Sequence, residues 1–414
     1  MASLDLLRRL VPLWGMLLAG LLIVSRRPDA VMHARFWAED GRTFYADVYN
    51  RGLLATLAVP QSGYFQELPT LAAGIAQLAP LALAPLITNS IAIVVRVLPV
   101  GLLLSPRAET ISPGIVVRAL LATLYIALPG TFESDANVDN ALWYLAVAAV
   151  LVLMLRPPRR RSTRALDVTI LALCSVTGVF SIALAPLAFL HRRRRGAGAV
   201  SRLTLGILTV GAAIQLLALL VLQYHLPHGF GARPRVSVPL HPSVTGLLQI
   251  LGIRVIAEPL LGNAVVLSAT AATLLGILGA VGALTALRRG TAELKLMVAF
   301  GGALFVMAVA HPWGVDWQEL TVYPTGSRYF IIPQLAAVAT LVWAIGATRV
   351  PWRLVPAGAL VYMCLFTIPR NWTYPPFRPT GFTRQAALFE HAHPGSRVTF
   401  QLEPRGWSMT LVKR

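Results

Sequence analysis

Long apolar runs, separated by short loops that are rich in arginine, dominate the pattern of the chain. A run of about 20 apolar residues is long enough to cross the hydrocarbon core of a bilayer as a helix. The pattern therefore predicts an all-α polytopic membrane protein with about nine full spans. We place these spans at residues 10–25, 81–104, 114–130, 141–155, 203–223, 263–287, 296–311, 329–348 and 354–369.

The arginine-rich loops orient the spans, because short loops rich in Lys and Arg stay in the cytoplasm. The pair Arg8–Arg9 and the loops 156–164 and 191–202 are therefore predicted to be cytoplasmic. The loop 131–140 has no Lys or Arg and is predicted to lie outside. We expect the protein in a bacterial inner (plasma) membrane, with its N-terminus in the cytoplasm and its C-terminus outside.

Residues 165–190 lie between two predicted cytoplasmic loops and are too short to cross the bilayer twice. They are expected to enter and return as a broken hairpin, kinked near Gly178 and Pro186. Broken helices are tolerated where protein or a water-filled cavity satisfies the freed backbone groups, so the break indicates a cavity. Two more segments, 67–79 and 244–261, are predicted to be interfacial helices.

The chain divides into a transmembrane domain, 1–369, whose first outer loop is 26–66, and a small extracytoplasmic tail, 370–414. Within the tail, 383–391 reads as a helix, and 398–402 and 408–412 read as the strands of a hairpin. The tail is too small to hold a core alone, so we expect it to pack against the outer loops.

Composition narrows the classes of function. The chain of 414 residues is 56% hydrophobic and only 13% charged, which excludes an ordinary cytosolic enzyme. The net charge of +19 is explained by the arginine-rich loops that orient the spans, so no nucleic-acid partner is predicted.

The cysteines and histidines indicate no metal site. Cys174 and Cys364 each lie in an apolar stretch without another cysteine nearby. The spacing of His225, His228 and His241 matches no standard metal site, and no metal ligands are assigned.

Two adjacent carboxylates, Glu39 and Asp40, stand in the first outer loop. Burial would raise the pKa of either one and suit it to act as a general base. The alternative is a hydrated helix cap or turn, and the pair alone does not decide between them. The neighbouring aromatics, Trp37 among them, fit either an interfacial belt or a stacking wall for a sugar.

A second acidic group and two cations complete the candidate chemistry. Asp135 and Asp139 would share one face if their loop were helical, and a hydrated acidic loop is the alternative. Arg328 could hold a phosphate or reach lipid headgroups. Arg254, in an otherwise apolar segment, is costly unless paired. No phosphate-binding loop, dinucleotide motif, nucleophile elbow or HExxH motif is present.

This pattern resembles the GT-C superfamily of integral-membrane glycosyltransferases. Those proteins have an acidic pair just after the first span and a second acidic position in the next outer loop, and here Glu39–Asp40 and Asp135/Asp139 fall in that way. The interfacial helix at 67–79 and the broken helices at 165–190 are also similar. The resemblance implies that residues 1–369 form the catalytic domain.

The resemblance further implies transfer of a sugar from a polyprenyl-phosphate carrier to a glycan or lipid acceptor on the outer side, with inversion. Asp40 would be the base, with Glu39 the alternative. No cofactor is obligatory, although a divalent cation could be shared by an acidic residue. The residues expected to bind substrate are Trp37, Tyr64, Asp135, Asp139, Arg254, Arg328 and Tyr329.

Two other classes of function compete with this interpretation. A transporter or flippase for a lipid-linked or anionic substrate would also have broken helices and cations beside a cavity. Transporters commonly show internal repeats and charges near the bilayer midplane, whereas most carboxylates here fall in predicted outer loops. A scaffold protein would not need three acidic outer loops that converge on one mouth.

Overall fold

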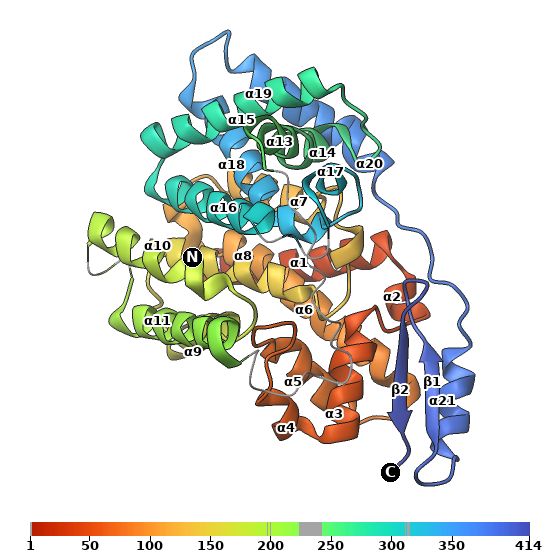
Figure 1. Cartoon of the computed structure of the whole chain (residues 1–414). Helices are drawn as coiled ribbons and strands as arrows, with labels where there is room; N and C mark the ends of the chain where they lie inside the picture. The colour runs from red at the N-terminus through yellow and green to blue at the C-terminus, as the bar shows by residue number, and fades with distance from the viewer. Residues whose placement is uncertain (1, 197, 199, 223–241, 311, 313–314) are drawn as a thin grey trace.

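The computed structural model describes residues 2–196, 198, 200–222, 242–310, 312 and 315–414, and it is nearly all helical (Figure 1). Several helices long and apolar enough to cross a bilayer mark the chain as a multi-pass membrane protein. Six described helices meet that length: Leu81–Leu104, Arg202–Leu222, Val244–Leu261, Ala269–Arg289, Ala292–Ala310 and Ser327–Ala347. Shorter apolar helices are Leu10–Arg26, Ile115–Ile126, Ala141–Met154 and Leu354–Arg370.

Each of the nine predicted spans coincides with one of these apolar helices, five of them long and four short. The sixth long helix, Val244–Leu261, is the one that we predicted to be interfacial. Glu258 near its C-terminal end contacts Gly130, and Gly246 near its N-terminal end lies beside Trp317. Gly130 is the last residue of the predicted span 114–130, at its outer end, and Trp317 belongs to a loop predicted to lie outside, so both ends of the helix lie near predicted outer segments. The number of spans stays a prediction.

The first half of the chain forms a helical bundle around α8 (Ala141–Met154), whose side chains are almost all buried. An all-apolar helix of this kind is stable only inside a protein or a membrane. Against it packs α6 (Ala84–Leu104), and α1 (Ala2–Arg26) and α7 (Ile115–Ile126) pack in turn against α6. Gly15 and Gly101 let α1 and α6 approach closely. The loops that follow α1 and precede α8 therefore meet at one end of the bundle.

That residues 165–190 enter the membrane and return stays a prediction. The predicted break is confirmed, because the segment forms two helices, α9 (Arg161–Ser175) and α10 (Phe180–Arg195). They are separated at 176–179, where Gly178 adopts a φ of +82° that only glycine reaches without strain. Pro186 lies inside α10. The break is bonded to the first outer loop, because Gly178 N–H donates to the Phe65 carbonyl at 2.9 Å.

The second half adds a further layer of helices. Its members are α11 (Arg202–Leu217), α13 (Val244–Ile250), α14 (Glu258–Leu261), α15 (Ala269–Arg289), α16 (Ala292–Ala310), α17 (Trp317–Leu320), α18 (Ile331–Ala347), α19 (Leu354–Tyr362) and α20 (Ile368–Arg370). The helix that contains α13 and α14 crosses α15 at Gly252 and Gly276, where a larger side chain would meet the partner's backbone. Short 3₁₀ turns at Phe132–Ser134 and Ser327–Phe330 bring two loops to the site described below.

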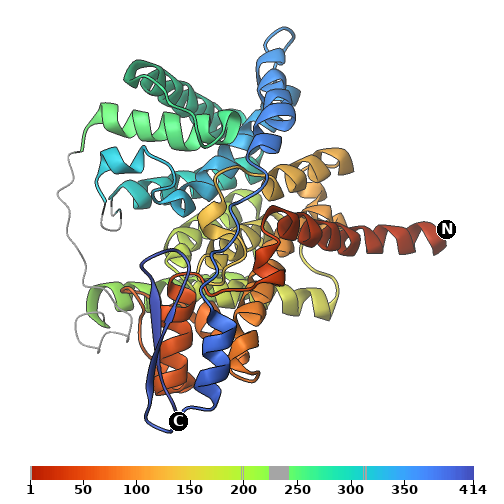
Figure 2. The ribbon, with the colours of Figure 1, turned by 90° about the vertical axis from the view of Figure 1, so that its right-hand side faces the viewer.

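The tail and the first outer loop share a core of their own (Figures 1 and 2). The tail supplies α21 (Phe382–Glu390) and the antiparallel strands β1 (Arg397–Gln401) and β2 (Ser408–Val412), in the register Thr399↔Thr410. The first loop supplies α2 (Asp29–Met32), a wide turn at Asp40–Tyr45, α3 (Ala46–Arg51), α4 (Leu53–Leu57) and α5 (Glu67–Ala76). The predicted helix, hairpin and packing of the tail are confirmed, and so is the helix at 67–79.

Candidate functional site

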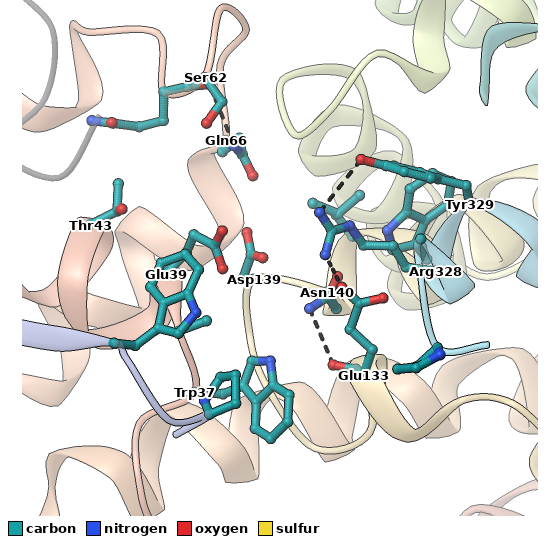
Figure 3. Close-up of a pocket in the computed structure, with 18 of the residues that line it drawn as sticks. Trp37, Glu39, Thr43, Ser62, Gln66, Glu133, Asp139, Asn140, Arg328 and Tyr329 are labelled. Atoms are coloured by element: carbon teal, nitrogen blue, oxygen red, sulfur yellow. Dashed lines mark hydrogen bonds and ion pairs between the residues drawn. The ribbon is translucent and has the colours of Figure 1, made fainter. Parts of the chain in front are cut away.

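A cavity of about 490 Å³ opens where the outer loops and the tail meet. Its walls come from five segments that are far apart in the chain, namely 37–43, 61–66, 132–143, 324–329 and 404–407. Figure 3 shows charged groups converging there from three of these segments, 37–43, 132–143 and 324–329. The broken hairpin does not line the cavity itself, but it holds the 61–66 segment in place through the backbone bond at Gly178.

Two carboxylates in the cavity wall form no direct ion pair, although the charge of Arg328 acts on both. Glu39 is partly exposed and Asp139 is buried, and Figure 3 shows their side chains directed toward one another. Within the described part of the chain, neither carboxylate has a hydrogen-bond or ion-pair partner. Burial, and next the negative charges of Glu39 and Asp40, raise the pKa of Asp139 well above its ordinary value. The pair is therefore suited to hold or accept a proton.

Asp40, our first choice as the base, is not in the cavity wall. Its side chain is 1% exposed, and its oxygens accept the backbone N–H groups of Val138 (3.1 Å) and Asp139 (2.7 Å). Burial raises the pKa of Asp40 to about 7, although the two N–H groups oppose that rise. The prediction that Asp40 contacts the acceptor is therefore corrected: Asp40 joins the first outer loop to the second and positions its neighbours.

The prediction that Asp135 binds substrate is also corrected. The segment 132–140 is a 3₁₀ turn followed by loop rather than a helix, so Asp135 and Asp139 do not share a face. The Asp135 carboxylate is fully buried and forms an ion pair with Arg96 of α6. A buried charge with such a partner is committed to structure, because breaking the pair leaves the other charge uncompensated.

Arg328 is the cation that lines the cavity, as predicted, together with Tyr329. The Arg328 side chain is 24% exposed and forms an ion pair with Glu133, which is 20% exposed. The guanidinium lies over the Tyr329 ring, 5.1 Å from its centroid. The Tyr329 ring in turn meets Trp143 edge to face at 5.7 Å. Arg328 is thus anchored, yet its pairing with a single exposed carboxylate leaves it able to exchange that partner for an anion.

Arg254 does not reach the cavity, so its predicted contact with substrate is corrected. Its Nε pairs with Glu258 at 3.1 Å, and one Nη donates to Ser327 Oγ at 2.9 Å. The guanidinium also stacks over Phe330 at 5.0 Å. The cost of a buried cation is met here by a carboxylate one helical turn away. Through Ser327, Arg254 supports the segment that carries Arg328.

The two other predicted binding residues, Trp37 and Tyr64, do line the cavity. Trp37 is held edge to face against Phe132 at 5.5 Å, with the Arg27 guanidinium 5.0 Å from its ring centroid. Burial raises the pKa of the Tyr64 hydroxyl, so this group stays protonated and can donate a hydrogen bond. Both residues fit a site that takes a polar ligand with an apolar face.

Strained backbone also marks this site. Among the described residues, positive φ at a non-glycine position occurs at Ala38, Ser62 and Ala136. Ala38 and Ser62 line the cavity, and Ala136 lies in the loop between Glu133 and Asp139. Such conformations cost free energy and tend to be kept at functional sites. The segments 37–43, 61–66 and 132–143 of the site therefore carry one strained residue each.

Sequence reasoning missed three buried arginines behind the site. Arg26 and Arg27 donate to main-chain carbonyls of the 126–135 segment, and Arg96 pairs with Asp135. Signals for them were present in the sequence. Arg26 and Arg27 follow the first span on the predicted outer side, against the usual bias of charge, and Arg96 is a lone charge in an apolar span.

It also missed the contribution of the tail. Glu403 N–H donates to the Phe36 carbonyl at 3.2 Å, and the Ala38 N–H donates to the Glu403 carbonyl. This short ladder fixes the backbone just before Glu39 and brings Pro404 and Trp407 into the cavity wall. The sequence indicates a turn at 403–406, but it does not indicate that Glu403 pairs with Trp37, which lies 366 residues earlier in the chain.

No cluster of three or more His, Cys, Asp or Glu side chains that could hold a metal ion occurs among the residues described. The candidate histidines 225, 228 and 241 lie outside the described residues. In comparisons with protein-family models and with curated proteins, the chain matches none of them. The geometry of the cavity therefore carries the functional argument.

Proposed function

We propose that the protein is a membrane glycosyltransferase of the GT-C type. It would transfer a sugar from a polyprenyl-phosphate carrier to a glycan or lipid acceptor on the extracytoplasmic side. One observation carries the proposal: Glu39 and Asp139 face each other without a direct ion pair, in a cavity that also contains Arg328. A base, a phosphate-binding cation and aromatic surfaces are the groups that such a transfer needs.

In this proposal Glu39 or Asp139 removes the proton from an acceptor hydroxyl. The acceptor oxygen then bonds to the anomeric carbon while the bond from that carbon to the phosphate oxygen breaks, so the configuration inverts. The electron pair leaves with the polyprenyl phosphate, and Arg328 stabilises that charge after exchanging Glu133 for the phosphate. The raised pKa of Asp139 makes its carboxylate a stronger proton acceptor than an ordinary aspartate.

The topology proposed for this function has about nine spans in a bacterial inner membrane, with the N-terminus inside and the cavity outside. The support is the arginine-rich loops at 156–164 and 191–202, which lie at the far ends of helices from the cavity loops. A donor anchored in the bilayer explains how transfer proceeds without a nucleotide-binding motif in the chain.

The proposal is tested with the full-length protein in proteoliposomes. Short-chain farnesyl-phosphoryl hexoses and pentoses serve as donors and octyl glycosides as acceptors, with products identified by mass spectrometry. Glu39→Gln or Asp139→Asn should lower the transfer rate about 100-fold or more, as expected for loss of a general base. Glu319→Gln is the matched control, because Glu319 is an exposed outer-loop carboxylate outside the cavity wall.

Normal transfer in both cavity variants would refute the assignment of the base, and absence of transfer from every donor would refute the activity. Movement of intact farnesyl-phosphoryl sugar across the bilayer without transfer would instead support the competing flippase.

A further inference from the structure

Four arginines gather at the junction between α8 and α9, at the opposite end of α8 from the cavity wall. Arg159 and Arg160 lie in the connecting loop, and Arg161 and Arg164 belong to the first turn of α9. All four side chains are exposed, and none has a hydrogen-bond or ion-pair partner among the described residues. We call these four residues the α9 arginine cluster.

Two carboxylates close to the cluster are engaged by other arginines. Asp167, in the next turn of α9, accepts two hydrogen bonds from Arg107, at 2.9 and 2.6 Å. Glu109 forms an ion pair with Arg156 at 2.6 Å. The first turn of α9 contains no acidic residue. The positive charge of the cluster is therefore not neutralised within the described part of the chain.

The backbone that carries the cluster is held in a defined arrangement. Arg107 Nε donates to the Arg156 carbonyl at 2.8 Å, and the Arg156 N–H donates back to the Arg107 carbonyl at 3.1 Å. Thr110 Oγ1 donates to the Met154 carbonyl at 2.6 Å. A loop that serves only to orient a span needs positive charge but no such fixed structure. These bonds therefore indicate that the arginines are presented to a ligand.

The arrangement of the four charges is unfavourable without an anion. Arg160 and Arg164 are four residues apart, and Arg161 and Arg164 are three apart, so like charges lie next to each other at the start of α9. A guanidinium group presents planar hydrogen-bond donors that match the oxygens of a phosphate. The cluster therefore favours a ligand that carries phosphate groups.

The exposed surface of α9 becomes apolar directly beyond the cluster. Ala165 is exposed and Leu166 is 42% exposed, and Thr169 and Ala172 continue this exposed face at helical spacing. A soluble phosphate compound would contact the arginines alone. A phospholipid has an anionic headgroup followed by acyl chains, which is the order of charged and apolar surface along α9. Arginine clusters at the end of a membrane helix attract anionic lipids of the adjacent leaflet.

We propose that the α9 arginine cluster binds an anionic phospholipid, whose phosphate contacts the guanidinium groups and whose acyl chains lie along the exposed face of α9. Four cations within six residues exceed the charge of a single phosphodiester, so a headgroup with two phosphates binds more tightly than a headgroup with one. This site is separate from the cavity, and the inference does not depend on the proposed function.

The experiment counts the lipids bound to the full-length protein in detergent by native mass spectrometry. The probes are cardiolipin with two phosphates, phosphatidylglycerol with one, and zwitterionic phosphatidylcholine. The variant combines Arg159→Gln, Arg160→Gln, Arg161→Gln and Arg164→Gln. It should lower the affinity for cardiolipin about tenfold or more and leave the affinity for phosphatidylcholine within about twofold.

The matched control removes the same number of charges from other loops. It combines Arg288→Gln, Arg289→Gln, Arg349→Gln and Arg353→Gln, because these side chains are also exposed and have no partner among the residues that the structure describes. The control should change the affinity for cardiolipin by less than about threefold. Arg161→Gln combined with Arg164→Gln is a second variant in case the fourfold variant fails to fold, and it should weaken cardiolipin binding about threefold or more.

Equal losses of cardiolipin affinity in the cluster variant and the control variant would overturn the site, because net charge alone would then explain binding. Wild-type affinity in the cluster variants would overturn it as well. Inorganic pyrophosphate is the soluble competitor: displacement of cardiolipin by an equal concentration of pyrophosphate would show that the ligand is a soluble phosphate compound and would refute the assignment to a lipid.

Discussion

Gln215 offers a sharp test of how the membrane helices hold the cavity. It is fully buried in α11, inside a helix apolar enough to span the membrane. Its side chain accepts the Phe65 N–H at 2.9 Å and donates to the Phe65 carbonyl at 3.1 Å. Phe65 directly precedes Gln66 in the cavity wall, so one uncharged side chain fixes the segment 61–66 from within the bundle.

Gln215→Leu keeps the size of the side chain but leaves the Phe65 N–H without a partner, while the Phe65 carbonyl still accepts the Gly178 N–H. An unpartnered backbone donor costs about 1–3 kcal/mol, so the free energy of unfolding should fall by about that amount. The matched control is Gln249→Leu, since the Gln249 side chain, also in an apolar helix, has no hydrogen-bond partner among the described residues. This control should change the free energy of unfolding by less than about 0.5 kcal/mol.

Cys174 is the reporter for this measurement. Its thiol is fully buried at the end of α9, beside the break that bonds to residues 65–68, whereas Cys364 is exposed. In a Cys364→Ser background, a maleimide dye should react only when the structure around Cys174 opens on heating. Gln215→Leu should lower the temperature at which the dye begins to label Cys174 by several degrees. Equal opening temperatures for the Gln215 and Gln249 variants would refute the argument that Gln215 holds the segment.

Three further outcomes are expected. Glu133→Gln should tighten farnesyl phosphate binding and Arg328→Ala should weaken it, each about tenfold, because the first frees the cation and the second removes it. Arg96→Leu or Asp135→Leu alone should destabilise the protein by about 3–5 kcal/mol in the Cys174 assay, while the double variant recovers most of that loss. Finally, burial raises the pKa of Asp40 to about 7, so the native state holds a proton that the unfolded chain releases near pH 4. Its contribution to stability is complete below about pH 4 and is lost as the pH rises through about 7, and Asp40→Asn should flatten that part of the pH–stability curve.

The local pattern of residues along the chain was sufficient to predict much of the architecture. Apolar runs predicted where helices lie, because a bilayer requires continuous hydrogen-bonded helices of apolar residues. Gly178 marked the break between α9 and α10, since few other residues adopt its backbone conformation. Alternating residues around a proline–glycine turn predicted the hairpin of the tail, and this too is a property of neighbours in the sequence.

The roles of the acidic residues were decided by the tertiary structure alone. Glu39 and Asp40 are adjacent and chemically similar, yet one faces the cavity and the other accepts two N–H groups from a loop 98 and 99 residues away. Asp135 and Asp139 separate in the same way, because only Asp135 meets Arg96. What a charged group does depends on which partners the fold brings to it, and partners far apart along the chain leave no local pattern.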